Sequence, residues 1–160
     1  MERVYMAKFQ HERLAKMSFD LEKKLKQASE SVEEAYQFGD HTDSAEFETA
    51  ISDEHLTKSR LAKLTGSYGN YEVVDTSKII IDRVRIGTTV ELVDLDNREE
   101  VTVNIVGVGP VKLENKEISY KTPFGATIYL AEAGEEREVK INMNKKRYMI
   151  KSISRYLPEE

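Results

Sequence analysis

The spacing of apolar residues changes from a helical to a strand period about halfway along the 160-residue chain. From Leu14 to Ala35, apolar residues follow one another at steps of 3, 4, 4, 3, 4 and 3, which is typical of a coiled-coil seam. A weaker series of the same kind runs from Phe47 to Tyr68. Because the segment between the two series is short and contains a glycine, the pattern predicts an antiparallel hairpin of two helices.

The second half of the chain predicts a compact antiparallel β-sheet with one short helix. The glycines of "TGSYGN" are expected to end the second long helix, and Pro123 suits the first turn of the short helix. We expect "LDNRE" and "NKK" to form hairpin turns. Alternation and Val and Ile content predict strands at 88–94, 100–106, 117–120, 137–143 and 147–153.

These expectations place the chain in the α+β class with two domains. An antiparallel coiled-coil hairpin is expected over residues 1–76, with an acidic tip near 39–46. The antiparallel sheet domain is expected over residues 77–160.

Composition limits the functions that the chain can have. A net charge of -5 argues against a free-standing nucleic-acid binder. The absence of cysteine excludes disulfides and thiolate metal sites. There is no apolar run of membrane-spanning length, and the N-terminus is charged where a signal peptide needs an apolar stretch, so we expect a cytoplasmic protein that does not contact a membrane. The common catalytic motifs are missing, and His11, His41 and His55 lie among polar residues, where a solvated side chain is the simplest interpretation.

The segment "FGDHTDSAEF" between the two helical series has two interpretations. Asp43 and Glu46 have the spacing of a capping box, and Asp40 can accept backbone hydrogen bonds in the turn. Alternatively, the two aspartates share a divalent cation, because carboxylates are suitable Mg²⁺ ligands. Two side chains do not complete such a site, so this tip is better suited to completing the active site of another molecule.

The outer part of the expected hairpin contains only acidic charges. No Lys or Arg occurs between Gln27 and Thr57. Such a run should repel nucleic acid and attract metal ions or basic channels. The same interval contains nine acids: Glu30, Glu33, Glu34, Asp40, Asp43, Glu46, Glu48, Asp53 and Glu54.

Two separate segments of the chain contain motifs. The segment "VRIGTTVELVDLDNREEVTVNIVG" is followed by "KTPFGATIYLAEAGEEREVKI", which is similar to the pattern Ser-Pro-Ile-Gly-x-Ala-Leu-x-Gly-x-x-x-Gly-Asp. The tip from Gly39 to Phe47 is similar to Gly-Asp-Leu-Ser-Glu-Asn-Ala-Glu-Tyr. In both motifs the chain resembles the Gre family of bacterial transcript cleavage factors. The resemblance implies an N-terminal antiparallel coiled coil and a C-terminal domain of FKBP-like fold.

The resemblance also implies a function in transcription elongation. The C-terminal domain would dock at the secondary channel of RNA polymerase, through a loop that contains Thr122, Pro123, Phe124 and Gly125. The hairpin would then bring Asp40 and Asp43 to the catalytic Mg²⁺. There the two acids would help to hold a second Mg²⁺ and to position the attacking water, so that the polymerase cleaves its own backtracked RNA.

The same resemblance implies which partners the chain has. It would be a monomer without a cofactor of its own, since RNA polymerase supplies the Mg²⁺. It would stimulate the polymerase rather than act as an enzyme alone, and would meet the RNA 3′ end and DNA only within the elongation complex.

Several residues depart from the family pattern and keep alternatives open. Tyr36 and Ile51 stand where the family usually has basic residues, Asp43 replaces Glu, and His41 replaces Leu. One alternative is a Gre-like channel regulator that inhibits RNA polymerase without RNA cleavage. Another is an FKBP-like protein-interaction module that uses the hairpin as a spacer.

Overall fold

The computed structural model describes residues 2–37 and 45–159, and the chain divides into two compact units. The hairpin unit comprises Arg13–Gly69. The sheet unit comprises Met1–Glu12 together with Asn70–Glu160.

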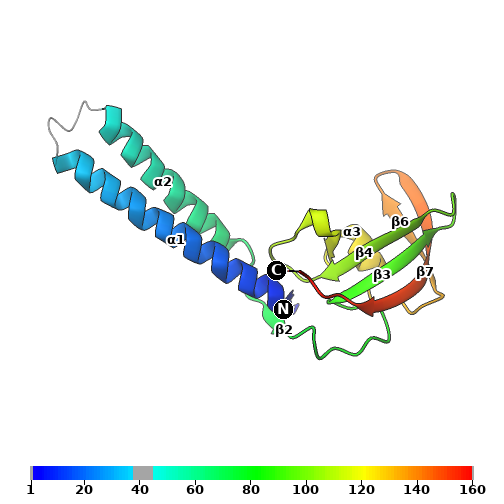
Figure 1. The fold of residues 1–160 in the computed structure, drawn as a ribbon. Coiled ribbons are helices and arrows are strands. Elements are labelled where there is room, and N and C mark those ends of the chain that lie inside the picture. Colours follow the sequence, from blue (N-terminus) through cyan, green and yellow to red (C-terminus); the bar gives the residue numbers. More distant parts are fainter. Residues whose placement is uncertain (1, 38–44, 160) are drawn as a thin grey trace. The chain divides into compact units, whose positions relative to one another are not determined.

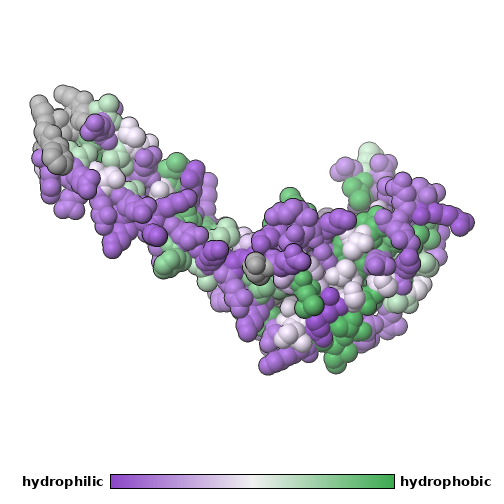
Figure 2. All heavy atoms as spheres, viewed as in Figure 1, coloured by the Kyte–Doolittle hydropathy of each residue, from purple (hydrophilic) through white to green (hydrophobic). Residues whose placement is uncertain are grey.

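The hairpin unit contains two long helices, as the apolar spacing predicts. Helix α1 spans Lys8–Gln37 and helix α2 spans Ala45–Gly66, and they run side by side (Figure 1). Most of the predicted seam positions are less exposed than their neighbours, and the predicted end of the second helix at "TGSYGN" is confirmed. Hydrophilic residues cover most of the visible surface of the hairpin (Figure 2), in keeping with a narrow apolar stripe between two solvated helices.

A polar residue in the seam of α2 is held by hydrogen bonds. The carboxylate of Glu54 accepts a hydrogen bond from Lys58 Nζ at 3.1 Å, one turn further along the same helix. The hydrogen bonds that Glu54 accepts from Lys58 and from Ser29 of α1 lower the pKa of Glu54. The polar interruption of the seam therefore links the two helices instead of separating them.

The sheet unit is built on a five-stranded sheet in the order β5-β4-β3-β7-β6. The two predicted hairpin pairs, β3 with β4 and β6 with β7, are confirmed as antiparallel. Strand β3 also pairs with β7 in antiparallel orientation, but β5 pairs with β4 in parallel, so the sheet is mixed. A register shift between Glu91 and Leu92 interrupts the β3–β7 ladder, and irregularities of this kind bend a sheet. The strands are β3 Thr88–Asp94, β4 Glu100–Val106, β5 Glu117–Ser119, β6 Glu136–Ile141 and β7 Asn144–Arg155.

The turn between β6 and β7 lies two residues before its predicted position at "NKK". Asn142 and Met143 form the turn, and Ile141 pairs with Asn144. Asn142 has a φ of 57°, which asparagine tolerates better than most residues. The Asn142 position therefore determines where the chain reverses, and the lysines that follow belong to β7.

The core of the sheet unit lies on the inner face of the strands. Along β3, Val90 and Leu92 are fully buried, while Glu91 between them is half-buried. Each such side chain stabilises the fold by about 2 kcal/mol through burial. Helix α3, Pro123–Ile128, contributes Ile128 to the same core.

A second, parallel pair of strands was not predicted. Strand β1, Tyr5–Ala7, pairs with β2, Glu72–Val74. These strands lie in the chain just before α1 and shortly after α2. The chain thus enters and leaves the hairpin within the sheet unit.

Gln10, in the first turn of α1, attaches the N-terminal segment to the sheet. Its fully buried side chain accepts hydrogen bonds from Ala7 N at 3.1 Å and Gly107 N at 2.8 Å. Its amide donates to Gly107 O at 3.0 Å and Pro110 O at 3.4 Å. Gly107 has no room for a side chain, because a Cβ there would lie 2.4 Å from Tyr5 O. This contact joins residues that are about 100 positions apart in the sequence.

Candidate functional site

The predicted tip acids Asp40 and Asp43 lie outside the described residues, as does His41. The structure describes the last turns of α1 and the first turns of α2, which border this segment in the sequence. Glu46 and Glu48 lie in the first turn of α2, where negative charge is favourable, and the last turn of α1 has no basic residue.

An aromatic pair joins the outer ends of the two helices. The rings of Tyr36 in α1 and Phe47 in α2 lie 6.3 Å apart, centroid to centroid, at an angle of 46°. Such a pair contributes about 1 kcal/mol. Tyr36 is nevertheless 59% exposed, whereas Phe47 is half-buried. Phe47 and Ile51 are four residues apart and so lie on one face of α2.

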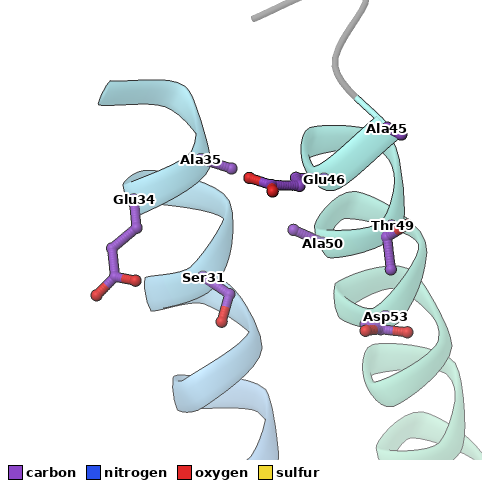
Figure 3. A pocket seen from close by; sticks show the side chains of 8 residues that line it. All are labelled: Ser31, Glu34, Ala35, Ala45, Glu46, Thr49, Ala50 and Asp53. Atoms are coloured by element: carbon purple, nitrogen blue, oxygen red, sulfur yellow. The ribbon is translucent and has the colours of Figure 1, made fainter. Parts of the chain in front are cut away.

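A hollow of about 550 Å³ lies between the helices next to this pair. Ala35 of α1 and Ala50 of α2 line it, and their short side chains leave the space open. Glu46 points from α2 towards α1, close to Ala35 (Figure 3). The other lining residues include Glu34 and Asp53, so the hollow is bordered by carboxylates and small side chains. The described outer hairpin is therefore acidic on its faces and between its helices.

The predicted docking residues 122–125 form the start of α3. Thr122 is its N-cap: the hydroxyl accepts a hydrogen bond from Gly125 N at 3.1 Å and donates to Ser119 O at 2.7 Å. Pro123 occupies the first turn, as predicted. Phe124 packs against Tyr148 of β7, with ring centroids 5.5 Å apart.

The motif residues divide into those that build α3 and those that its surface exposes. Gly125 is buried, and a Cβ there would lie 2.2 Å from Ser119 O. Phe124 is half-buried and packs against the core, while Thr122, Pro123 and Ala126 are exposed. Phe124 and Gly125 therefore hold α3 against the rest of the sheet unit, whereas Thr122 and Pro123 start the helix and, like Ala126, remain exposed.

Leu130 lies where the motif pattern has a glycine. Its φ is 65°, in the left-handed region that favours glycine. Backbone hydrogen bonds hold this conformation, because Leu130 N donates to Val84 O at 2.8 Å and Val84 N donates to Ala131 O at 2.8 Å. Leu130 therefore has a backbone conformation that glycine adopts more easily than leucine does.

Within residues 2–37 and 45–159, no group of three or more His, Asp or Glu side chains is arranged to hold a metal ion. None of the helices in that part of the chain is long and apolar enough to cross a bilayer.

Known proteins are similar to this chain in sequence. Residues 77–155 match the family described as "Transcription elongation factor, GreA/GreB, C-term". The chain is 37% identical over 122 residues to the transcription elongation factor GreA of Sulfurovum sp. (strain NBC37-1), which covers 76% of this chain and 75% of that protein. It is 31% identical over 153 residues to the GreA of Chloroherpeton thalassium, which covers 95% and 97%. Among solved structures, the chain is similar to the crystal structure of GreA factor homolog 1 (Gfh1) of Thermus thermophilus, with a TM-score of 0.42 and 19% identity over 96% of this chain and 99% of that one.

The coiled-coil hairpin and its attached sheet unit are thus those of a transcription elongation factor and not of an enzyme that acts alone. The chain belongs to the GreA/GreB family, which confirms the resemblance found in the sequence.

Proposed function

We propose that this factor binds RNA polymerase at its secondary channel and brings Asp40 and Asp43 to the catalytic Mg²⁺, where they stimulate cleavage of backtracked RNA. The observation that carries the proposal is the purely acidic outer hairpin of a GreA-type factor. Between Gln27 and Thr57 there are nine acids and no Lys or Arg.

The charge distribution supports a site that is completed by the polymerase. A run of carboxylates attracts divalent cations and basic channel walls. In this proposal the metal belongs to the polymerase. Asp40 and Asp43 would supply oxygen ligands to a second Mg²⁺ and help to orient the attacking water, in keeping with two-metal phosphodiester hydrolysis.

Residues 77–160 are the proposed docking domain. The exposed residues at the start of α3, namely its N-cap Thr122 with Pro123 and Ala126, are its proposed contact surface. Phe124 and Gly125 would act indirectly, by holding α3 against the core. The full proposed hairpin domain is residues 1–76. In this proposal the factor works as a monomer in the cytoplasm, and meets RNA and DNA only inside the elongation complex.

A second candidate is inhibition of the polymerase without RNA cleavage. The specific observation in its favour is the lack of cations near the tip: Tyr36 and Ile51 stand where the family usually has basic residues. An acidic tip without RNA-binding cations can still hold or displace Mg²⁺, or block the entry of nucleotides.

One assay separates the two candidates. A stalled, backtracked elongation complex is mixed with the protein, and the release of short RNA fragments from the 3′ end is measured over time. Faster release of short 3′ fragments, abolished by Asp40→Asn with Asp43→Asn, supports cleavage. Slower nucleotide addition without fragments, relieved by the same substitutions, supports inhibition. If the protein has neither effect, both candidates are wrong.

Two matched controls make this test specific. Glu33→Gln with Glu48→Gln removes the same charge from exposed positions of the outer hairpin, and should leave activity nearly unchanged if the tip acids act locally. For docking, Ala126→Glu on α3 should weaken polymerase binding. Met143→Glu, at a fully exposed residue of the β6–β7 turn, introduces the same charge away from α3 and should not.

A further inference from the structure

Leu130, two residues after the end of α3, has two features that are unfavourable for the chain by itself. Its φ is 65°, in the left-handed region where Cβ comes too close to the following carbonyl oxygen. Its side chain is 43% exposed, so burial within the sheet unit stabilises it only in part. Glycine, which the motif pattern has at this position, would avoid the backbone strain.

The other residues with a positive φ show what is unusual about this leucine. Among residues 2–37 and 45–159, four residues other than glycine have a positive φ, and Leu130 is the only apolar one. A single exposed apolar side chain is ordinary on a protein surface. One that is exposed and also held in a strained backbone conformation indicates a function. The other three are polar and exposed: Arg98, Lys116 and Asn142.

The surroundings of Leu130 hold its side chain in a fixed place. Two backbone hydrogen bonds of 2.8 Å join it to the neighbouring stretch: Leu130 N donates to Val84 O, and Val84 N donates to Ala131 O. The residues that flank these bonds form an ion pair, between Arg83 Nη2 and Glu132 Oε1 at 3.5 Å. A fixed apolar side chain beside charged groups is the arrangement found at protein interfaces, where a polar rim surrounds an apolar anchor.

The position of Leu130 in the chain favours RNA polymerase as the partner. The proposed contact surface at α3 consists of Thr122, Pro123 and Ala126, which have small side chains and little apolar area to bury. Leu130 follows Ala126 by four residues and is the next exposed apolar residue along the chain. It would supply the larger apolar group that this surface otherwise lacks.

We propose that Leu130 extends the docking surface of α3 and packs against an apolar part of the RNA polymerase surface. Binding buries the side chain, so the strained backbone is compensated in the complex. The inference rests on the proposed function, because it takes RNA polymerase as the partner. Since Leu130 departs from the motif pattern, the contact is a specificity determinant of this chain.

The test compares the affinities of three full-length variants for RNA polymerase. Leu130→Asn removes the apolar group but tolerates a positive φ, so its stability should stay close to that of the wild type. Leu130→Met keeps an apolar side chain of similar volume. The matched control Leu113→Asn makes the same change at an 80% exposed leucine in the 3₁₀ helix Leu113–Asn115. Urea unfolding of each variant verifies that it is folded under the binding conditions.

Leu130→Asn should raise the dissociation constant by about 5- to 20-fold, because part of a leucine side chain is no longer buried on binding. Leu130→Met and Leu113→Asn should both stay within about twofold of the wild type. Weaker binding by a variant that is as stable as the wild type distinguishes a direct contact from a structural role.

Three results would overturn the inference: wild-type affinity of Leu130→Asn, an equal loss in Leu130→Met, or an equal loss in Leu113→Asn. A loss in Leu130→Asn that comes with a clear fall in its urea midpoint would also overturn it, because the role would then be structural.

The variant Ala126→Glu separates this failure from a failure of the proposed function. If Ala126→Glu weakens binding and Leu130→Asn does not, only the inference about Leu130 is wrong. If the wild-type protein does not bind RNA polymerase, both proposals are wrong.

Discussion

The buried amide of Gln10 provides the sharpest test of how the sheet unit holds its N-terminal segment. The substitution Gln10→Ala removes a side chain that is fully buried and makes four hydrogen bonds. It leaves two backbone donors, Ala7 N and Gly107 N, without their acceptor. A nearby carbonyl, Gly107 O, loses its donor at 3.0 Å.

The expected loss follows from these groups. Each buried donor that loses its partner costs about 1–3 kcal/mol. Two such donors, with some relaxation of the backbone, give a decrease of about 3 to 5 kcal/mol in the free energy of unfolding of the sheet unit, which is large for a single substitution. The matched control is Gln27→Ala, the same chemical change at an exposed position of α1, with an expected effect below about 0.5 kcal/mol.

Gln10→Glu adds a pH dependence with a definite sign. One oxygen can still accept from Ala7 N and Gly107 N, but the other faces the carbonyl oxygens of Gly107 and Pro110, where a donor is needed. Folding therefore favours the protonated carboxyl, and the variant should lose stability as the pH rises above about 4.3, the ordinary value for glutamate. The wild type, with a neutral amide, has no such contribution from this position.

Urea unfolding followed by circular dichroism measures the stabilities, and amide hydrogen exchange at Ala7 and Gly107 locates the effect. An unchanged urea midpoint for Gln10→Ala, or protection of both amides equal to that of the wild type, would refute the reasoning. A Gln10→Glu variant whose stability does not fall between pH 4 and pH 7 would refute the assignment of the amide as donor.

Three further predictions follow from single positions. At position 130, where φ is 65°, the Leu130→Gly variant should be more stable than the Leu130→Ala variant by about 1 kcal/mol. At most other positions alanine is more stable than glycine. The urea midpoints of the two variants test this prediction. Gly125→Ala would bring a Cβ to 2.2 Å from Ser119 O, and should lower stability by about 2 to 3 kcal/mol, while Gly66→Ala, with nothing within 4 Å of its Cβ, should not. The pKa of Glu54 is lowered, so its stabilisation is present at neutral pH and lost as the pH falls through the folded pKa; Glu54→Gln should lower the melting temperature at pH 7, with no difference from the wild type in strong acid.

The long helices and the central strands were predictable because the apolar residues of each repeat at a regular spacing within one continuous segment of the sequence. The seam from Leu14 to Ala35 predicted α1, and alternation predicted β3 and β4 with the bounds that the structure has. Position-specific turn residues were partly readable: Asn142 could have located the β6–β7 turn, since asparagine favours a positive φ.

The missed features depend on residues that are distant in the sequence. Strands β1 and β2 have three residues each, too few for a period, and they pair only because the hairpin brings the chain back. Gln10 lies in the polar stretch "KFQHER", where nothing local marks it as buried. The direction in which β5 pairs was likewise not readable, because alternation is the same in parallel and antiparallel strands.

The candidate site was predictable in composition and only partly in structure. The acids of the outer hairpin, and the absence of basic residues at Tyr36 and Ile51, were identified from the sequence, because each depends only on the type of residue at a given position. It did not predict the contact between Tyr36 and Phe47, which depends on how two helices are aligned. It also did not separate Gly125, which is required by a close backbone approach, from the exposed residues beside it.

The pairing of β1 with β2 has a consequence for how proteins of this kind can diversify. Because the strands before and after the hairpin pair with each other, the sheet unit closes its own hydrogen bonds around the point where the hairpin is inserted. The stretch Arg13–Gly69 can then be lengthened, shortened or exchanged for that of a relative without breaking those bonds. Selection can therefore change the residues of the hairpin, and with them its chemistry, while the sheet unit stays the same.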